Sequence, residues 1–132
     1  MRYPVAIEPG DEQHAFGVAV PDLPGCFSAG DTLDEAIDNV REAIELWLET
    51  VIDEGGCVPA PRPISQHQPD PEYSGWIWAV VDVDLAALSG KAERVNITLP
   101  ARVLRRIDAA AKAAGESRSG YIARRALENP RP

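Results

Sequence analysis

The sequence predicts an α+β fold, in which an antiparallel sheet with one main helix is followed by a smaller module of one strand and two helices. Three observations lead to this prediction. Apolar runs near the N-terminus are separated by turn residues, as in antiparallel hairpins. One long stretch then has apolar residues three and four positions apart, which is typical of an amphipathic helix. From Lys91 onward both the charge and the pattern change, which marks a second module.

Short apolar runs at the N-terminus predict three strands. Residues 3–7 and 14–20 are separated by Glu-Pro-Gly-Asp, which has the turn residues of a hairpin loop. The stretch Pro-Asp-Leu-Pro-Gly at 21–25 then predicts a compact turn, because each proline fixes its φ angle and glycine accepts conformations closed to other residues. A third strand over 26–29 follows, and Gly30 ends it.

A capping box begins the predicted main helix. Thr32 and Glu35 have the spacing at which a hydroxyl and a carboxylate bind the free amides of a first turn. Apolar residues at helical spacing continue to Val51, and the pair of glycines at 55–56 ends the pattern. The other side of this helix carries an acidic column, which consists of Asp34, Asp38, Glu42, Glu45 and Glu49.

The stretch after the main helix differs from the helix in composition. Residues 58–74 contain five prolines among polar residues, which predicts a connecting arm on the surface without regular structure. Residues 75–83 are rich in aromatic and β-branched side chains on both alternations, which predicts a strand that is covered, or nearly covered, on both faces. Asp84 is placed to cap a short turn over 85–88, and residues 89–90, Ser-Gly, predict a flexible joint.

The second module is predicted to fold as a homodimer, because about 40 residues are too few for a stable isolated core. Residues 94–99 alternate strictly between apolar and polar side chains, which predicts a two-faced strand. Pro100 suits the first position of a helix that Gly115 ends, and Ser117 is placed to cap a second helix. This order of elements follows a ribbon-helix-helix plan, in which strands from two chains pair as a ribbon.

Charge is divided unevenly between the two modules, whose predicted boundaries are 1–88 and 91–132. The formal net charge is −8, but residues 1–90 carry 3 arginines, no lysine and 17 acidic residues, a net charge of −14. The remaining residues carry 10 basic and 4 acidic residues, a net charge of +6. An acidic module repels phosphates and a basic one attracts them, so the two modules are expected to bind different partners.

The outer face of the predicted ribbon supplies candidate base-reading residues, Arg94, Asn96 and Thr98. A two-stranded ribbon fits the major groove of double-stranded DNA, where arginine reads guanine and asparagine reads adenine. The alternative is a strand whose exposed face is simply polar. The DNA interpretation is favoured because the ribbon, its basic surroundings and the spacing of the two helices agree.

The start of the last helix supplies candidate phosphate-binding residues, Ser117, Arg118 and Ser119. Hydroxyls, a guanidinium and free backbone amides converge at such a position. An ordinary helix cap with a solvated arginine is the alternative. Further arginines add positive potential, and some are expected to pair with Asp108 or Glu128 on their own helices. These further residues are Arg102, Arg105, Arg106, Arg124 and Arg125.

Two sets of motifs resemble known families. Arg-Val-Asn-Ile-Thr-Leu-Pro at 94–100, with Gly-Glu-Ser-Arg-Ser at 115–119, resembles the ribbon-helix-helix repressors. Pro-Asp-Leu-Pro-Gly-Cys at 21–26, followed by Gly-Asp-Thr-Leu-Asp-Glu-Ala at 30–36, resembles the HicB-type antitoxins. Together the two resemblances cover nearly the whole chain.

The resemblance implies a type II antitoxin. Residues 1–88 would form a partial ribonuclease-H-like fold that binds and neutralises a small basic, RNA-cleaving HicA-type toxin. Residues 91–132 would dimerise and repress the operon by binding operator DNA, and dimers would associate further through their N-terminal modules. The acidic column has the right sign to meet an RNA-binding surface, although a solvated helix face explains it equally well on electrostatics alone. The sheet edge and the arm are alternative toxin contacts.

Catalysis is not expected, although a ribonuclease-H-like fold raises the question. Such enzymes hold metal ions with clustered carboxylates, and no spacing here forces acidic side chains on a central strand to converge. The carboxylates considered are Glu8, Asp22, Glu45, Asp82 and Asp84. His14 and His67 have no evident nucleophile, and Cys26 is predicted to be a small buried residue. We therefore predict no catalytic residue, no metal ion and no cofactor.

The remaining expectations concern location and the alternative function. No run approaches the length needed to span a bilayer, and the first residues lack the pattern of a secretory signal, so the protein is expected to be cytoplasmic without membrane contact. Two cysteines are too few for a disulfide framework, which predicts reduced thiols. The alternative function is a stand-alone ribbon-helix-helix repressor whose N-terminal module senses a small ligand or a protein.

Overall fold

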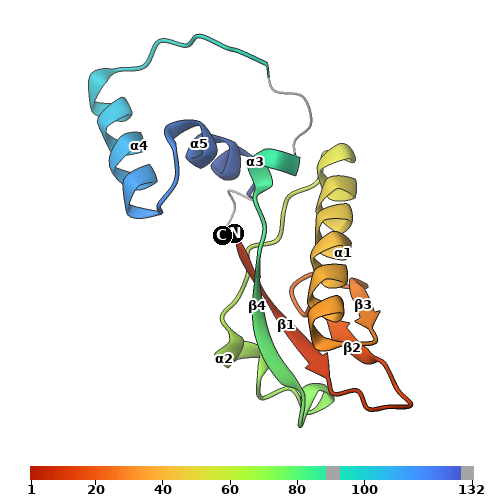
Figure 1. Cartoon of the computed structure of the whole chain (residues 1–132). Helices are drawn as coiled ribbons and strands as arrows, with labels where there is room; N and C mark the ends of the chain where they lie inside the picture. The colour runs from red at the N-terminus through yellow and green to blue at the C-terminus, as the bar shows by residue number, and fades with distance from the viewer. Residues whose placement is uncertain (89–92, 129–132) are drawn as a thin grey trace.

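A four-stranded antiparallel sheet organises the N-terminal part of the chain in the computed structural model, which describes residues 1–88 and 93–128 (Figure 1). The strands are β1 (Arg2–Glu8), β2 (Phe16–Ala19), β3 (Phe27–Gly30) and β4 (Ile77–Asp82), in the order β3-β2-β1-β4. The helices are α1 (Leu33–Asp53), α2 (Ile64–His67), η1, a 3-10 helix (Pro71–Tyr73), α3 (Leu85–Leu88), α4 (Ala101–Ala113) and α5 (Arg118–Leu127). The predicted antiparallel sheet with one main helix is confirmed.

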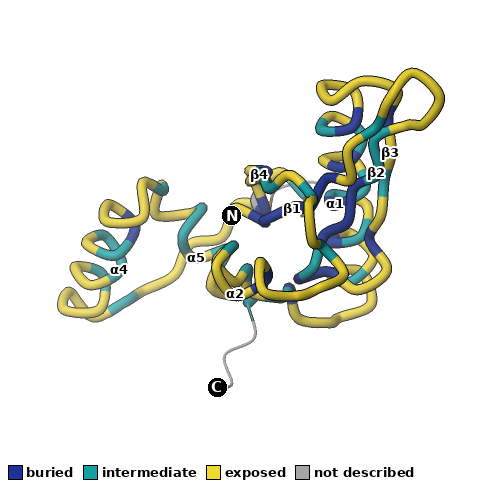
Figure 2. Tube along the Cα trace, turned by 90° about the horizontal axis from the view of Figure 1, so that it is seen from below, coloured by how far each residue is buried: buried dark blue, intermediate teal, exposed yellow. Residues whose placement is uncertain are grey.

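The core lies between the sheet and α1. Tyr3, Val5 and Ile7 of β1 cluster with apolar side chains that recur on one side of α1, and all of them are buried. In Figure 2 the buried segments concentrate on β1, β2 and the facing side of α1. The α1 residues in this cluster are Ala36, Val40, Ile44 and Leu48. The predicted amphipathic stripe therefore forms the core, as hydrophobic burial requires.

The turn from β3 into α1 is unusually close. A Cβ atom on Gly30 would lie 2.4 Å from the backbone nitrogen of Ala36, so only glycine fits there. The hydroxyl of Thr32 accepts a hydrogen bond from the Glu35 amide at 3.1 Å, which confirms the predicted N-cap. β2 is shorter than predicted because residues 11–14 close the preceding loop, where the Asp11 amide donates to the His14 carbonyl at 2.9 Å.

The proline-rich arm contradicts its prediction, because it contains regular structure and buried residues. α2 and η1 lie within it, and Val58 and His67 are buried. The Tyr3 hydroxyl donates a hydrogen bond to the Pro59 carbonyl at 2.6 Å, and the His67 ring stacks on Trp78 of β4 with 6.2 Å between centroids. The arm therefore packs against the sheet instead of only connecting two elements.

The prediction that residues 75–83 form a strand covered, or nearly covered, on both faces is wrong in part. β4 pairs with β1 from Arg2–Asp82 to Ile7–Ile77 and is the last strand of the sheet. Val81 is buried, whereas Ile77 and Val80 are 44% and 50% exposed. The apolar composition thus reflects an edge strand that the arm covers only partly, and composition alone does not distinguish this from a central strand.

The prediction of a strand over 94–99 is not met within this chain. Residues 93–100 are extended but have no strand partner among the described residues, and Val95 and Ile97 are 72% and 66% exposed. A strand needs a hydrogen-bonded neighbour, and in the predicted ribbon that neighbour belongs to a second chain. Pro100 is the N-cap of α4 and not its first helical residue.

The last helix contacts the N-terminal part, which the sequence analysis did not predict. The Val58 amide donates a hydrogen bond to the Leu127 carbonyl at 3.0 Å, and Val58 forms an isolated parallel bridge with Glu128. Leu127 also packs against the core, and α5 lies beside α3 (Figure 1). The predicted joint at residues 89–90 lies outside the described residues. Over the described ranges, no helix combines the length and apolar character needed to cross a membrane.

Candidate functional site

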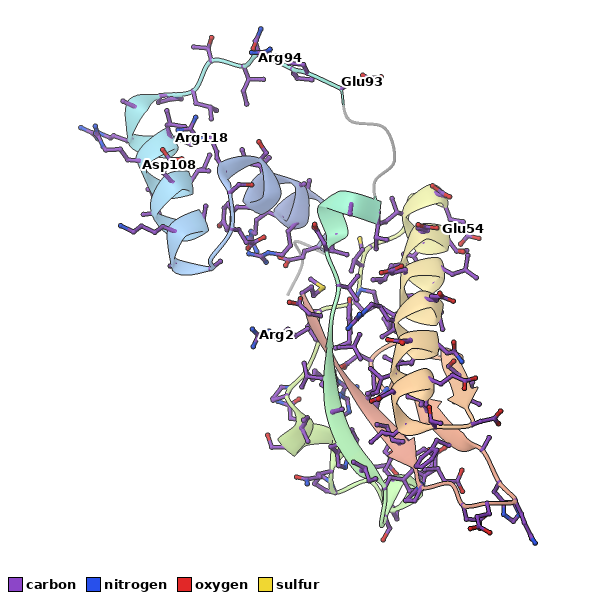
Figure 3. All side chains as sticks on the ribbon, in the orientation of Figure 1. Arg2, Glu54, Glu93, Arg94, Asp108 and Arg118 are labelled. Atoms are coloured by element: carbon purple, nitrogen blue, oxygen red, sulfur yellow. The ribbon has the colours of Figure 1, made fainter. Side chains whose placement is uncertain are left out.

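The predicted base-reading residues lie on the extended segment before α4. Arg94, Asn96 and Thr98 occupy alternate positions there, and all three are exposed. Figure 3 shows Arg94 on this segment, apart from Arg118, which lies between α4 and α5. Since extended backbone alternates its side chains, the three polar residues share one side and Val95 and Ile97 share the other. The segment thus presents a polar side and an uncovered apolar side.

Among the predicted phosphate-binding residues, one is tied to another helix. Ser117, Arg118 and Ser119 are exposed at the start of α5, and the Ser117 hydroxyl accepts a hydrogen bond from the Gly120 amide at 3.0 Å. Arg118 donates to both carboxylate oxygens of Asp108, at 2.7 and 2.9 Å. This hydrogen bonding holds the pKa of Asp108 below its usual range and raises that of Arg118. The expectation that Asp108 pairs on its own helix is therefore wrong.

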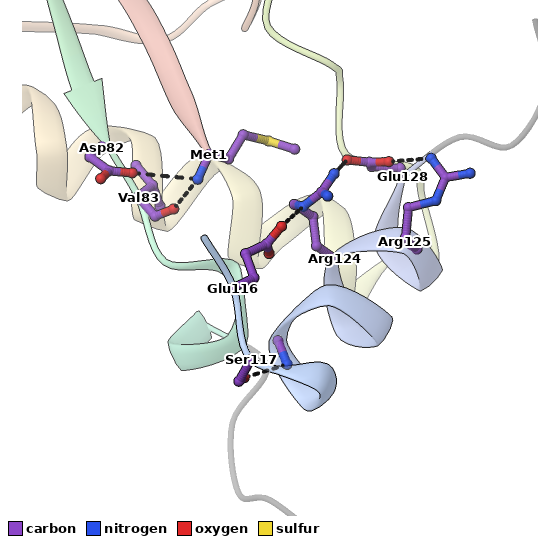
Figure 4. A network of polar contacts seen from close by, with 9 residues as sticks. Met1, Asp82, Val83, Glu116, Ser117, Arg124, Arg125 and Glu128 are labelled. Atoms are coloured by element: carbon purple, nitrogen blue, oxygen red, sulfur yellow. Dashed lines mark hydrogen bonds and ion pairs between the residues drawn. The ribbon is translucent and has the colours of Figure 1, made fainter. Parts of the chain in front are cut away.

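Two arginines of α5 are largely neutralised by acids, as Figure 4 shows. Arg124 donates to Glu116 at 2.8 Å and also to Glu128, which accepts from Arg125 at 3.0 Å as well. The expected pairing of Glu128 on its own helix is confirmed. We therefore assign the positive potential of this module mainly to Arg94 and to the exposed arginines of α4, which are Arg102, Arg105 and Arg106.

A cleft of about 1050 Å³ separates the α4–α5 turn from the end of the sheet. Ser117 and Gly120 line it from one side, and Met1, Asp82 and Val83 line it from the other. The Met1 amine donates to the Val83 carbonyl at 2.9 Å and lies 3.4 Å from an Asp82 carboxylate oxygen (Figure 4). The cap of α5 is therefore reachable from solvent.

The acidic column lies on α1 away from the sheet. Its five residues fall within an arc of about 80° at 100° per residue, which is the column that the sequence predicted. Asp34, Asp38, Glu42 and Glu49 are exposed and Glu45 is half-buried. Arg41 is the one basic residue of α1. The column thus forms a mainly negative surface over about four turns of helix, with the exposed Arg41 at its margin.

A buried polar cluster was missed by the sequence analysis. The Asp22 carboxylate accepts hydrogen bonds from the Arg62 side chain at 2.9 Å and the Arg62 amide at 3.1 Å, and lies 3.1 Å from Nε2 of His67. Asp22 belongs to the turn before β3, whereas both partners belong to the arm, so the cluster fastens the arm to the sheet. The only signal in the sequence is a carboxylate inside a proline-flanked turn, and this does not name its partners.

The carboxylates considered for metal binding do not form a metal site. Asp22 is occupied by Arg62 and His67, and Asp82 lies near the N-terminal amine. In residues 1–88 and 93–128, no three histidine, cysteine or acidic side chains are grouped so that they could hold a metal ion. Cys26 is buried, as predicted.

Comparison with known proteins identifies the family. Residues 3–126 match the model of the HicB-like antitoxin of bacterial toxin–antitoxin systems. The chain is 50% identical over 108 residues to an uncharacterised 14.9 kDa protein of Haemophilus phage HP1, a match covering 82% of this chain and 80% of that protein. The crystal structure of the Burkholderia pseudomallei antitoxin HicB superposes with a TM-score of 0.84 at 43% identity and covers 99% of both chains.

A further comparison is with a solved toxin–antitoxin complex. A chain of the HicA3 and HicB3 complex matches with a TM-score of 0.55 at 32% identity, covering 64% of this chain and 99% of that chain. The antiparallel sheet, the capped main helix and the family match over residues 3–126 all agree with the resemblance noted in the motifs at 21–26 and 30–36. The chain therefore belongs to the HicB-like antitoxins of bacterial toxin–antitoxin systems.

Proposed function

We propose that this chain binds and neutralises a small basic HicA-type toxin through its N-terminal module and represses its own operon through its C-terminal module. The observation that carries the proposal is the division of charge, because residues 1–90 have a net charge of −14 and the remaining residues +6. The first module suits a basic protein and the second suits a nucleic acid. The HicA3 and HicB3 complex is a related toxin–antitoxin assembly, which supports a toxin partner.

The C-terminal half of the proposal needs two chains. Val95 and Ile97 are exposed on the apolar side of the extended segment, and a second copy pairing with this segment would cover them. The paired segments would form a ribbon that presents Arg94, Asn96 and Thr98 to the major groove of operator DNA. Ser117, Arg118 and Ser119 would contact the flanking phosphates once Arg118 exchanges Asp108 for a phosphate oxygen.

The proposed antitoxin role is tested by expressing the small open reading frame beside this gene, with and without this chain. Growth arrest with loss of messenger RNA, reversed by this chain, is the expected result. If the neighbouring product is harmless, or if this chain does not reverse its toxicity, the antitoxin role is refuted. The protein is then better explained as a stand-alone repressor with a sensing N-terminal module.

Replacing Arg94 or Asn96 with alanine should remove operator selectivity and leave toxin binding unchanged. Each lost base contact is expected to lower specific affinity about 10-fold to 100-fold, because a good bidentate contact discriminates by about 1–3 kcal/mol. Fluorescence anisotropy with operator and scrambled DNA measures this change. The control is Arg102→Ala, which should weaken binding to both DNA sequences alike. Loss of toxin binding in the same variants would contradict the separation of the two modules.

Reversing the charges of Glu42, Glu45 and Glu49 to lysine should slow association with the toxin about tenfold at low salt, because the column attracts a basic partner over a distance. The difference should shrink at high salt, where the attraction is screened. Stopped-flow association kinetics measures both effects. The matched variant with three glutamines, which removes charge without reversing it, should give an intermediate rate. Equal rates for all three proteins would place the attraction elsewhere.

A further inference from the structure

Three aromatic side chains meet where the arm enters β4. The ring of Tyr73 lies 5.3 Å from that of Trp76 and 5.5 Å from that of Trp78 between centroids, in edge-to-face geometry. All three residues are half-buried, so each ring keeps part of its surface open. Large rings of this kind contribute most to core and interface energies. A cluster of aromatic rings that stays partly exposed to solvent is typical of an interaction surface.

The same surface continues along an open sheet edge. β4 is the last strand, and among the described residues β1 is its only strand partner. Edge strands usually avoid pairing with other chains by means of charges, prolines or bulges. β4 has one charged residue, Asp82 at its end. Val80 is exposed on the same face as Trp78, whereas Ile77 is exposed on the other face, opposite Ile7 of β1. The arm covers β4 only partly, and among the described residues no backbone hydrogen bond joins β4 to a strand other than β1, so its outer edge can accept an added strand.

The charge around the rings is negative. Asp70, the N-cap of η1, and Glu72 within η1 are both exposed, and the Asp70 carboxylate accepts a hydrogen bond from the Glu72 amide at 3.0 Å. Burial raises the pKa of Tyr73, and the charges of Glu72 and Asp70 raise it further, so their field reaches the ring. No lysine or arginine occurs between Arg62 and Lys91; Arg62 is paired with Asp22, and Arg2 lies near Val80, away from the rings. A cation from a partner would be attracted both by the carboxylates and by the ring faces.

We infer that this arm–edge surface, formed by Asp70, Glu72, Tyr73, Trp76 and Val80, is where the toxin docks. A positively charged, extended segment of the toxin adds as a strand beside β4 and places a lysine or arginine side chain over the aromatic rings. The inference rests on the toxin binding proposed above and names the surface that carries it. It selects the sheet edge and the arm over α1 as the site of close contact.

The acidic column on α1 and the arm–edge surface then have different roles in toxin binding. The column on α1 acts at a distance and sets how fast the toxin arrives, as exposed charges do. The arm–edge surface makes the short-range contacts and sets how slowly the toxin leaves, because buried aromatic anchors act mainly on dissociation. Kinetics therefore distinguishes the two surfaces where an equilibrium affinity would not.

The test compares Trp76→Ala and Val80→Lys with wild type, using the full chain and the neighbouring gene's toxin in a catalytically inactive form. Surface plasmon resonance should show dissociation about 30-fold faster in both variants, the size expected for an interface hot spot. Phe27→Lys is the matched control. Phe27 is 67% exposed on β3, the opposite edge strand, so the same kind of change there should leave dissociation unchanged.

The outcomes separate the inference from the function on which it rests. Wild type that does not bind the toxin refutes the proposed function. If wild type binds and both variants dissociate within about twofold of it, or if Phe27→Lys weakens binding equally, the arm–edge surface is refuted. Circular dichroism and operator binding report whether each variant is folded. Val80→Lys changes an exposed side chain, so it keeps the test decisive even if Trp76→Ala unfolds the arm.

Discussion

Replacing Gly30 with alanine is expected to lower the free energy of unfolding by about 3 kcal/mol or more. A Cβ atom there would lie 2.4 Å from the Ala36 nitrogen and 2.8 Å from its Cα atom, well inside van der Waals contact. Both atoms belong to the first turns of α1, so α1 must move away from the sheet and lose core contacts. Overpacking against backbone costs more than against a flexible side chain. Urea denaturation of the purified protein measures the change.

Gly17 provides the matched control for this prediction. It lies on the neighbouring strand β2, where an added Cβ atom meets the Glu8 side chain at 3.5 Å, an ordinary contact. Gly17→Ala should therefore change stability by less than about 1 kcal/mol in either direction. If the two variants have equal stability, the close approach of β3 and α1 is not what requires glycine at position 30.

Replacing Asp22 with alanine is expected to cost about 3 kcal/mol of stability and to release the arm. The carboxylate is buried and holds the Arg62 side chain, the Arg62 amide and the His67 ring. Without it, His67 is left buried and loses its hydrogen-bond partner, and removing one member of a buried polar group is strongly destabilising. Thermal unfolding measures the loss of stability, and limited proteolysis measures exposure of residues 58–74.

Asp11→Ala is the control for Asp22→Ala. Asp11 also pairs with a histidine, since its carboxylate lies 2.9 Å from Nδ1 of His14, but both side chains are exposed. Its carboxylate also accepts hydrogen bonds from the Gln13 and His14 amides. Water can replace these exposed contacts, so the free energy of unfolding should change by less than about 1 kcal/mol. Equal effects of the two substitutions would mean that Asp22 does not fasten the arm. The same experiment on Asp22→Asn should give an intermediate result, because the amide oxygen still accepts a hydrogen bond.

Features set by neighbouring residues could be predicted from the sequence. The N-cap at Thr32, the apolar stripe of α1 and the cap at Ser117 all depend on residues within one or two turns, and each is confirmed. The arm could not be predicted in this way. Its prolines indicate irregular chain, but its position is set by Asp22 and Tyr3, which lie far from it in sequence. Tertiary contacts of this kind leave no periodic signal.

The candidate site, like the fold, could be predicted from the sequence only in part. Alternation in 94–99 predicts a polar side and an apolar side, and a strand there requires a second chain. The pairing of Arg118 with Asp108 across two helices was missed, because same-helix spacing suggested other partners. The aromatic content of residues 75–83 predicts a strand but does not show its place in the sheet. Only the strand order shows that these side chains border an open edge.

The position of β1 in the sheet has a consequence for synthesis on the ribosome. β1 lies between β2, which follows it closely in sequence, and β4, whose Val81 pairs with Tyr3 and which emerges only after α1 and the arm. In a nascent chain that ends before Ile77, β1 is still an edge strand. The sheet is completed only when β4 pairs with β1, which closes a loop across the N-terminal module. Until then the apolar side chains of β1 are not fully covered. Translation pauses within the arm would prolong this exposure and favour aggregation and proteolysis.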